Sequence, residues 1–125
     1  MIRKEDVFQC PIEVTMAIVG GKWKVVLLWH LRKEALRPTE IKKLIPDISD
    51  KMLTQQLREL QSDGLVERED FGEVPPKVEY RLTKLGQTLV PLFRELGQWG
   101  KDFLESLGDE APTVVVLQQK HDRAS

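Results

Sequence analysis

The middle of the chain, over residues 39–82, carries two helical patterns followed by two strand patterns. In the run SDKMLTQQLRELQSDG, leucines recur at spacings of four and three, which predicts a helix with one narrow buried stripe. Pro46 cannot continue the preceding helix, Ser49 can cap the next one, and Gly64 can end it because glycine tolerates positive φ. The sequence therefore predicts two consecutive helices joined by a short turn.

Two strand patterns follow this pair of helices. Residues 65–69 alternate apolar and polar side chains, and residues 78–82 repeat the alternation. The loop between them, FGEVPPK, contains Gly72 for turning and two prolines whose fixed φ stiffens its tip. These parts make a winged helix-turn-helix, with the helix-turn-helix at 39–63 and the wing at 65–82.

The second helix of this unit has a polar surface away from its leucine stripe. Its side chains are long or hydroxylic, of the types that hydrogen-bond base edges and phosphates in a major groove. An arbitrary amphipathic helix carries such a face for solvation alone, but the flanking helix and hairpin favour DNA binding here. The predicted DNA-contacting residues are Ser49, Lys51, Thr54, Gln55 and Arg58 around this helix, Lys42 on the preceding helix, and Lys77 in the wing.

The charge distribution supports this interpretation better than the net charge does. A net charge of -1 is low for a DNA-binding protein, because backbone binding depends on Lys and Arg displacing counterions. Residues 22–58, however, hold nine Lys and Arg against four Asp and Glu, whereas residues 83–110 hold three against five. A skew of this size also arises by chance, so it supports the DNA-binding prediction without carrying it.

Composition indicates one soluble domain of 125 residues, with 41% hydrophobic and 31% charged residues. The start, MIRKEDVF, lacks the apolar stretch of a secretion signal, and a single cysteine suits a reducing compartment. We therefore expect a cytoplasmic protein with no membrane partner. No phosphate loop, HExxH or paired-cysteine motif is present, which predicts no enzyme activity and no cofactor. His30 has no second ligand at metal-binding spacing, so no metal site is expected.

A further amphipathic segment follows the wing, at residues 84–107. Thr83 can cap a helix whose large apolar residues follow spacings of 4, 3, 4, 3 and 4, and Pro91 predicts a kink or break in it. This helix could fold back on its own domain. We expect it instead to pair with a second subunit, together with the helix that Pro11 begins, because three helices and a wing already form a core. The predicted interface residues are Leu89, Leu92, Phe93, Leu96, Trp99 and Phe103.

Three segments, CPIEVTMAIVGGKW, SDKMLTQQLRELQSDGLVER and EVPPKVEYRLTKLG, resemble in their order and spacing the HxlR-type winged helix-turn-helix transcription regulators of bacteria. The resemblance covers about residues 8–104 and supports a domain at 8–108, with a tail at 109–125 in which residues 113–117 could form a strand. It implies a mainly α (α+β) fold with N- and C-terminal dimerisation helices, in a MarR-like dimeric architecture.

The function implied is that of a sequence-specific, DNA-binding transcriptional regulator. Two symmetric reading helices would enter successive major grooves about 34 Å apart and bind an inverted-repeat operator in double-stranded DNA. Repression by blocking polymerase is the default expectation, and activation stays open. The alternative is a winged-helix protein-interaction module without specific DNA binding.

Cys10 is the candidate for chemistry. It directly precedes Pro11, at the expected N-cap of the first helix, where the positive end of the helix dipole favours a thiolate. It resembles the N-terminal cysteine with which redox- and electrophile-sensing members of the family respond to oxidants, quinones or aldehydes. A cross-subunit disulfide, a mixed disulfide with a small thiol and alkylation all stay open. The equal alternative is an inert cysteine that packs well.

Overall fold

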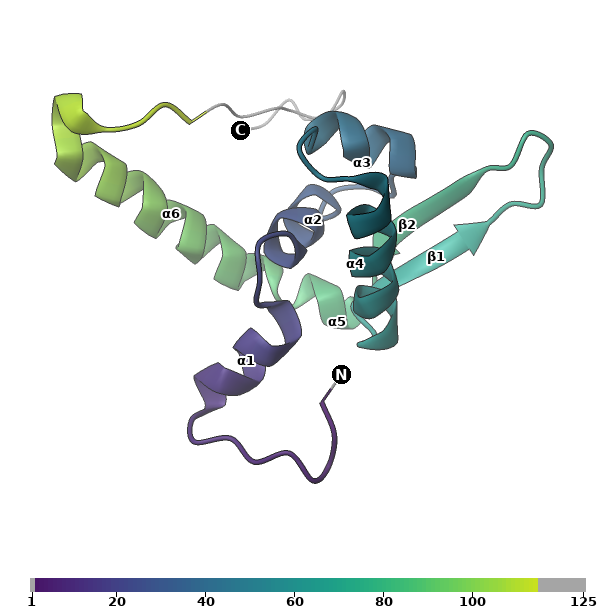
Figure 1. Cartoon of the computed structure of the whole chain (residues 1–125), viewed down its shortest axis with the longest axis horizontal. Coiled ribbons are helices and arrows are strands. Elements are labelled where there is room, and N and C mark those ends of the chain that lie inside the picture. Colours follow the sequence, from purple (N-terminus) through teal and green to yellow (C-terminus); the bar gives the residue numbers. More distant parts are fainter. Residues whose placement is uncertain (1, 115–125) are drawn as a thin grey trace.

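Three helices and a hairpin form most of the hydrophobic core of the computed structural model, which describes residues 2–114 (Figure 1). Val19, Val90 and Phe93, from the helices before and after this unit, complete the core. The leucine stripe predicted for the second helix of the helix-turn-helix is buried, with Leu57 2% and Leu60 0% exposed. These leucines lie in one cluster with Leu27 and Ile41 of the two preceding helices. The three helices are α2 (Lys24–His30), α3 (Pro38–Leu44) and α4 (Asp50–Ser62).

Local signals set the ends of α4. The Ser49 hydroxyl accepts a hydrogen bond from the Met52 amide at 3.1 Å, which confirms the predicted cap. After the helix, Gly64 takes a φ of 77°, as expected for the residue that ends it. The helix-turn-helix therefore runs from residue 38 to residue 62, shifted by one residue from the predicted segment.

The wing consists of two antiparallel strands, β1 (Val66–Asp70) and β2 (Val78–Leu82), whose register pairs Val66 with Leu82. A bridge that the sequence did not predict joins Leu36 to Tyr80 of β2. The Leu36 amide donates to the Tyr80 carbonyl at 2.9 Å, and the Tyr80 amide donates back at 2.8 Å. This contact fixes the connection between α2 and α3 against the middle of β2.

The segment after the wing is broken as Pro91 predicted, into α5 (Lys84–Gln87) and α6 (Val90–Leu107). Proline is tolerated in the first turn of α6, where its missing N–H has no intrahelical partner to lose. The Thr83 hydroxyl accepts from the Gly86 amide at 3.0 Å, which confirms it as the cap of α5. A short 3-10 turn, η1 (Gly108–Glu110), follows α6.

Helices α1 (Pro11–Val19) and α6 project away from the body of the molecule, as does the wing on the other side (Figure 1). The architecture is mostly helical with a small two-stranded sheet, which confirms the predicted fold class. Among residues 2–114, no helix is both long and apolar enough to cross a membrane. In the predicted tail strand, residues 113 and 114 have no regular structure, and residues 115–117 lie outside the described residues.

Candidate nucleic-acid interface

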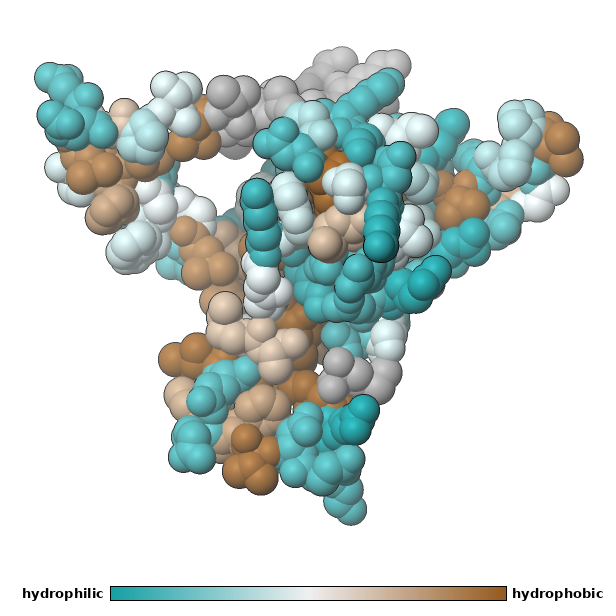
Figure 2. Space-filling model, viewed as in Figure 1, coloured by the Kyte–Doolittle hydropathy of each residue, from teal (hydrophilic) through white to brown (hydrophobic). Residues whose placement is uncertain are grey.

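The outward face of α4 forms a hydrophilic surface on the side of the molecule shown in Figure 2. Lys51, Thr54, Gln55 and Arg58 are all exposed and, with Asp50, line a shallow groove along this helix. The opposite face of α4 is anchored in the core by its leucines. A rigid helix therefore presents four of the predicted DNA-contacting side chains together.

These four side chains differ in whether hydrogen bonds within the protein engage them. The Thr54 hydroxyl donates to the Asp50 carbonyl at 2.9 Å, one turn back along the helix. Within the described residues, no hydrogen bond or ion pair holds the head group of Lys51 or of Arg58. Both cations are therefore available to phosphate oxygens or to base edges.

Two other predicted contact residues are engaged in the turn between α3 and α4. The Lys42 ammonium forms an ion pair with Asp50 at 3.1 Å and also donates to the Ile48 carbonyl. The Ser49 hydroxyl caps α4. Lys42 and Ser49 thus hold the turn in shape, so their side chains are less available to DNA than those of Lys51 and Arg58.

The wing has charged side chains that neutralise one another. Arg81 forms an ion pair with Glu69 at 2.7 Å, and a longer contact of 3.9 Å joins Arg68 to Asp70. The predicted contact residue Lys77 is half-buried, with its ammonium 4.5 Å from the centre of the Phe71 ring. The wing is therefore a weaker electrostatic surface than α4.

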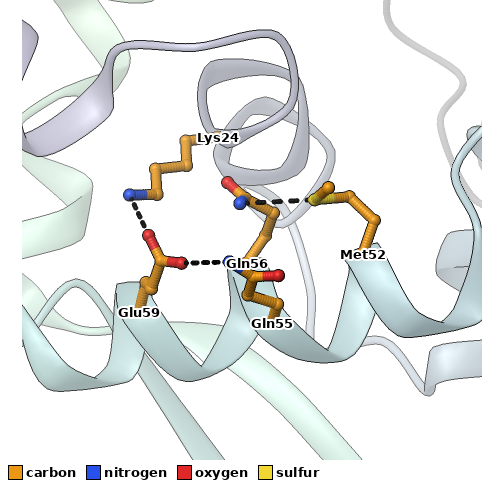
Figure 3. A network of polar contacts seen from close by, with 5 residues as sticks. All are labelled: Lys24, Met52, Gln55, Gln56 and Glu59. Atoms are coloured by element: carbon orange, nitrogen blue, oxygen red, sulfur yellow. Dashed lines mark hydrogen bonds and ion pairs between the residues drawn. The ribbon is translucent and has the colours of Figure 1, made fainter.

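A polar network between α2 and α4 was not predicted from the sequence (Figure 3). Lys24 of α2 is only 9% exposed, and its ammonium lies 2.7 Å from the Glu59 carboxylate. The hydrogen bond from Lys24 is the largest cause that lowers the pKa of Glu59 below its ordinary value, followed by the hydrogen bond from Gln55. Lys24 shares the helical spacing of the buried residues Leu27, Leu28 and Leu31, and that spacing was the signal that could have found it.

Apolar side chains gather on the two projecting helices, α1 and α6 (Figure 2). Of the predicted interface residues, four lie exposed on α6, and the rings of Trp99 and Phe103 stack with their centroids 5.4 Å apart. Ile12 and Met16 of α1 are also exposed, at 70% and 56%. The four exposed residues on α6, here called the apolar face of α6, are Leu92, Leu96, Trp99 and Phe103.

The other two predicted interface residues pack inside the subunit. Phe93 is 4% exposed and belongs to the core, and Leu89 packs against that core. Residues adjacent in a helix point about 100° apart, so Phe93 cannot share the narrow face on which Leu92 lies. Leu89 and Phe93 therefore do not belong to the exposed apolar face of α6.

Cys10 is exposed at the N-cap of α1, where the sequence placed it. Its backbone amide donates to the Glu13 carboxylate at 3.2 Å, and the Gln9 amide donates to the same oxygen. Glu13 occupies the third position of the helix, which is the usual place for such a reciprocal cap. The sequence analysis overlooked this acid, whose negative charge opposes the support that the helix dipole gives to a thiolate.

Residues 18–107 match the family described as HxlR-like helix-turn-helix. YkvN, an uncharacterized HTH-type transcriptional regulator of Bacillus subtilis (strain 168), is 49% identical over 113 residues, which cover 90% of this chain and 96% of YkvN.

Solved structures agree with this match. The redox regulator HypR in its oxidized form has a TM-score of 0.71 and 46% identity, covering 74% of this chain and 96% of HypR. The reduced form of the transcriptional regulator YodB from B. subtilis has a TM-score of 0.68 and 36% identity, covering 79% of this chain and 98% of YodB. The chain therefore belongs to the HxlR-like helix-turn-helix family, whose members are transcriptional regulators rather than enzymes.

Proposed function

We propose that this transcriptional regulator binds an inverted-repeat operator as a homodimer, with α4 of each subunit in the major groove, and represses the promoter that the operator overlaps. The observation that carries the proposal is the outward face of α4, where Lys51 and Arg58 are exposed on a helix anchored by its opposite side. Phosphates would meet these two cations, while Thr54 and Gln55 lie between them to meet base edges.

The homodimer is supported by the apolar side chains on the projecting helices. Trp99 is 68% exposed and Phe103 48% exposed, although both are large aromatic residues that ordinarily lose exposure on folding. Exposed apolar patches of this kind mark interaction sites, and a two-fold axis lets one patch cover its own copy. Pairing through α1 and α6 would leave α4 of each subunit free for DNA.

The test of DNA binding compares two arginine variants on the duplex upstream of the chain's own gene. Arg58→Ala should weaken binding by about 1–3 kcal/mol, because it removes a contact from α4. The matched control is Arg94→Ala, which removes an exposed arginine from α6 and should leave affinity unchanged. Wild-type affinity should also fall steeply between about 50 and 200 mM salt.

Equal affinity of the wild type and a Lys51→Ala/Arg58→Ala double variant would favour the protein-interaction module instead. Repression is tested by transcription in vitro from the same promoter. Adding the protein should lower the amount of transcript, and a rise would make the chain an activator.

We also propose that Cys10 makes the regulator responsive to oxidants or electrophiles. Support comes from its exposure at a helix N-cap and from the likeness to HypR, which is a redox regulator. Diamide or a quinone should release the wild-type protein from DNA and leave Cys10→Ser bound. Equal release of both proteins would remove Cys10 from the mechanism.

A further inference from the structure

We propose that Glu59 sets the base preference of the regulator by holding the side-chain amide of Gln55 in one orientation. Glu59 is then a positioning residue that acts through Gln55, and adenine is the base that the oriented amide selects. This inference rests on the proposed placement of α4 in the major groove. It follows from the network of Lys24, Glu59 and Gln55 in Figure 3.

The Glu59 carboxylate is held from behind by Lys24. Among the described residues, Lys24 is the one charged residue in the buried class, and its ammonium donates to Glu59 Oε1 at 2.7 Å. A buried ammonium without a partner is strongly unfavourable, so this contact persists as long as the core is folded. Lys24 is on α2, next to the core residues Leu27 and Leu28, and therefore ties the carboxylate to the rigid part of the subunit.

The second carboxylate oxygen of Glu59 holds Gln55. The Gln55 Nε2 group donates to Glu59 Oε2 at 3.1 Å. The bond from Lys24 is the first cause of the lowered pKa of Glu59, so the carboxylate is ionised at neutral pH. An ionised carboxylate can only accept hydrogen bonds, so the Gln55 NH₂ group must face it and the Gln55 carbonyl must point away.

This orientation limits what Gln55 can offer to a base. Its amide uses one N–H on Glu59 and keeps a carbonyl oxygen and one N–H for the groove. Adenine presents an N6 donor and an N7 acceptor, the pattern that a glutamine amide recognises with two hydrogen bonds. Guanine presents two acceptors, O6 and N7, and would require an amide turned with its NH₂ group outward. The network therefore favours adenine over guanine.

The experiment measures base preference rather than affinity alone. Duplexes carrying each base at every operator position are bound to the wild type and to Gln55→Ala, and the position at which Gln55→Ala loses discrimination is the contact. There the wild type should prefer adenine over guanine by about tenfold or more. In Glu59→Gln the ratio should fall towards one, because a neutral amide at this position can donate as well as accept and no longer dictates how Gln55 is turned.

Matched variants separate positioning from a general structural role. A structural role alone would weaken binding to both duplexes equally and leave the adenine-to-guanine ratio unchanged. In a Gln55→Ala background, Glu59→Gln should cause no further change in the ratio. If Glu59→Gln does not fold, Lys24→Met/Glu59→Gln replaces it, because that variant leaves no unpaired ammonium in the core.

Two results would overturn the inference while leaving DNA binding intact. One is a folded Glu59→Gln protein that keeps the full wild-type ratio. The other is a Gln55→Ala protein that keeps wild-type preference at every operator position. Failure of the wild type to bind any duplex selectively is a different outcome, since it removes the proposed function itself.

Discussion

The leucines of α4 and the residues on the apolar face of α6 follow the same helical spacing, yet they lie in opposite surroundings. The leucines of α4 are at most 5% exposed, whereas the residues on the apolar face of α6 are 42–68% exposed. Periodicity thus identifies the face of a helix that needs cover, but it does not say what provides the cover. The α4 side is Leu53, Leu57 and Leu60, and the α6 side is Leu92, Leu96, Trp99 and Phe103.

This difference in exposure separates two regions of the molecule. Helices α2 to α4 and the wing, together with Val19 of α1 and with Val90 and Phe93 of α6, form the core of one subunit. This core fixes the orientation of the outward face of α4. Other large apolar side chains of α1 and α6 are exposed, and under the proposed function a second copy of the chain covers them. Substitutions in the first region should therefore act on the folding of a subunit, and substitutions on the apolar face of α6 should act on pairing.

The largest effect is expected in the closed core. Leu60→Ala should lower the free energy of unfolding by about 2–5 kcal/mol, because it removes a fully buried side chain and leaves a cavity. Urea denaturation measures the change. The control Leu85→Ala, at a leucine that is 57% exposed on α5, should change the unfolding free energy by less than about 1 kcal/mol. Equal losses of unfolding free energy at the two leucines would show that burial on α4 is not what stabilises the subunit.

The next effect concerns the apolar face of α6. Trp99→Ala should weaken dimerisation by about 2 kcal/mol, roughly a thirtyfold rise in the dissociation constant, as for a buried aromatic residue at an interface. Sedimentation equilibrium measures it. Gln98→Ala alters the neighbouring residue, which hydrogen-bonds to Asp102, and should leave dimerisation unchanged. An unchanged dissociation constant in Trp99→Ala would show that α6 does not form the interface.

The smallest effect is expected at the partly buried ion pair between Lys24 and Glu59. Glu59→Gln should lower the free energy of unfolding by only about 1 kcal/mol at neutral pH, because solvent screens the carboxylate and a glutamine carbonyl can still accept the hydrogen bond from Lys24. The pKa of Glu59 is lowered in the folded protein, so its contribution is complete above the unfolded value of about 4.3 and is lost as the pH falls through the folded value.

Denaturation of the wild type and of Glu59→Gln over a series of pH values tests this dependence. The difference in unfolding free energy should be constant above about pH 5 and should shrink in acid. A difference that persists unchanged in acid would mean that the ionised carboxylate is not what stabilises the fold.

Features set by neighbouring residues could be predicted from the sequence. The cap at Ser49, the end of α4 at Gly64 and the break at Pro91 each depend on side chains within one helical turn. The bridge between Leu36 and Tyr80 could not be predicted, because a single pair of residues 44 positions apart has no period. Distant contacts of this kind depend on how the elements pack.

The predicted DNA-contacting residues show the same limit of prediction from sequence. The head groups of Lys51 and Arg58 stay available because they lie on the outer face of a helix. Lys42 instead donates to the Ile48 carbonyl in the turn, and Ser49 accepts from the Met52 amide in the first turn of α4. Short polar side chains before a helix prefer to cap it, and that preference competes with a role in binding. The partner of Lys24 was beyond prediction, since it comes from another helix.

The mass of the complex between the purified chain and its operator duplex tests most directly whether two reading helices act together. Sedimentation equilibrium should find two chains of 14.4 kDa on each duplex, and a free protein of twice that chain mass. One chain per duplex, at concentrations where binding is selective, would contradict operator binding by a homodimer.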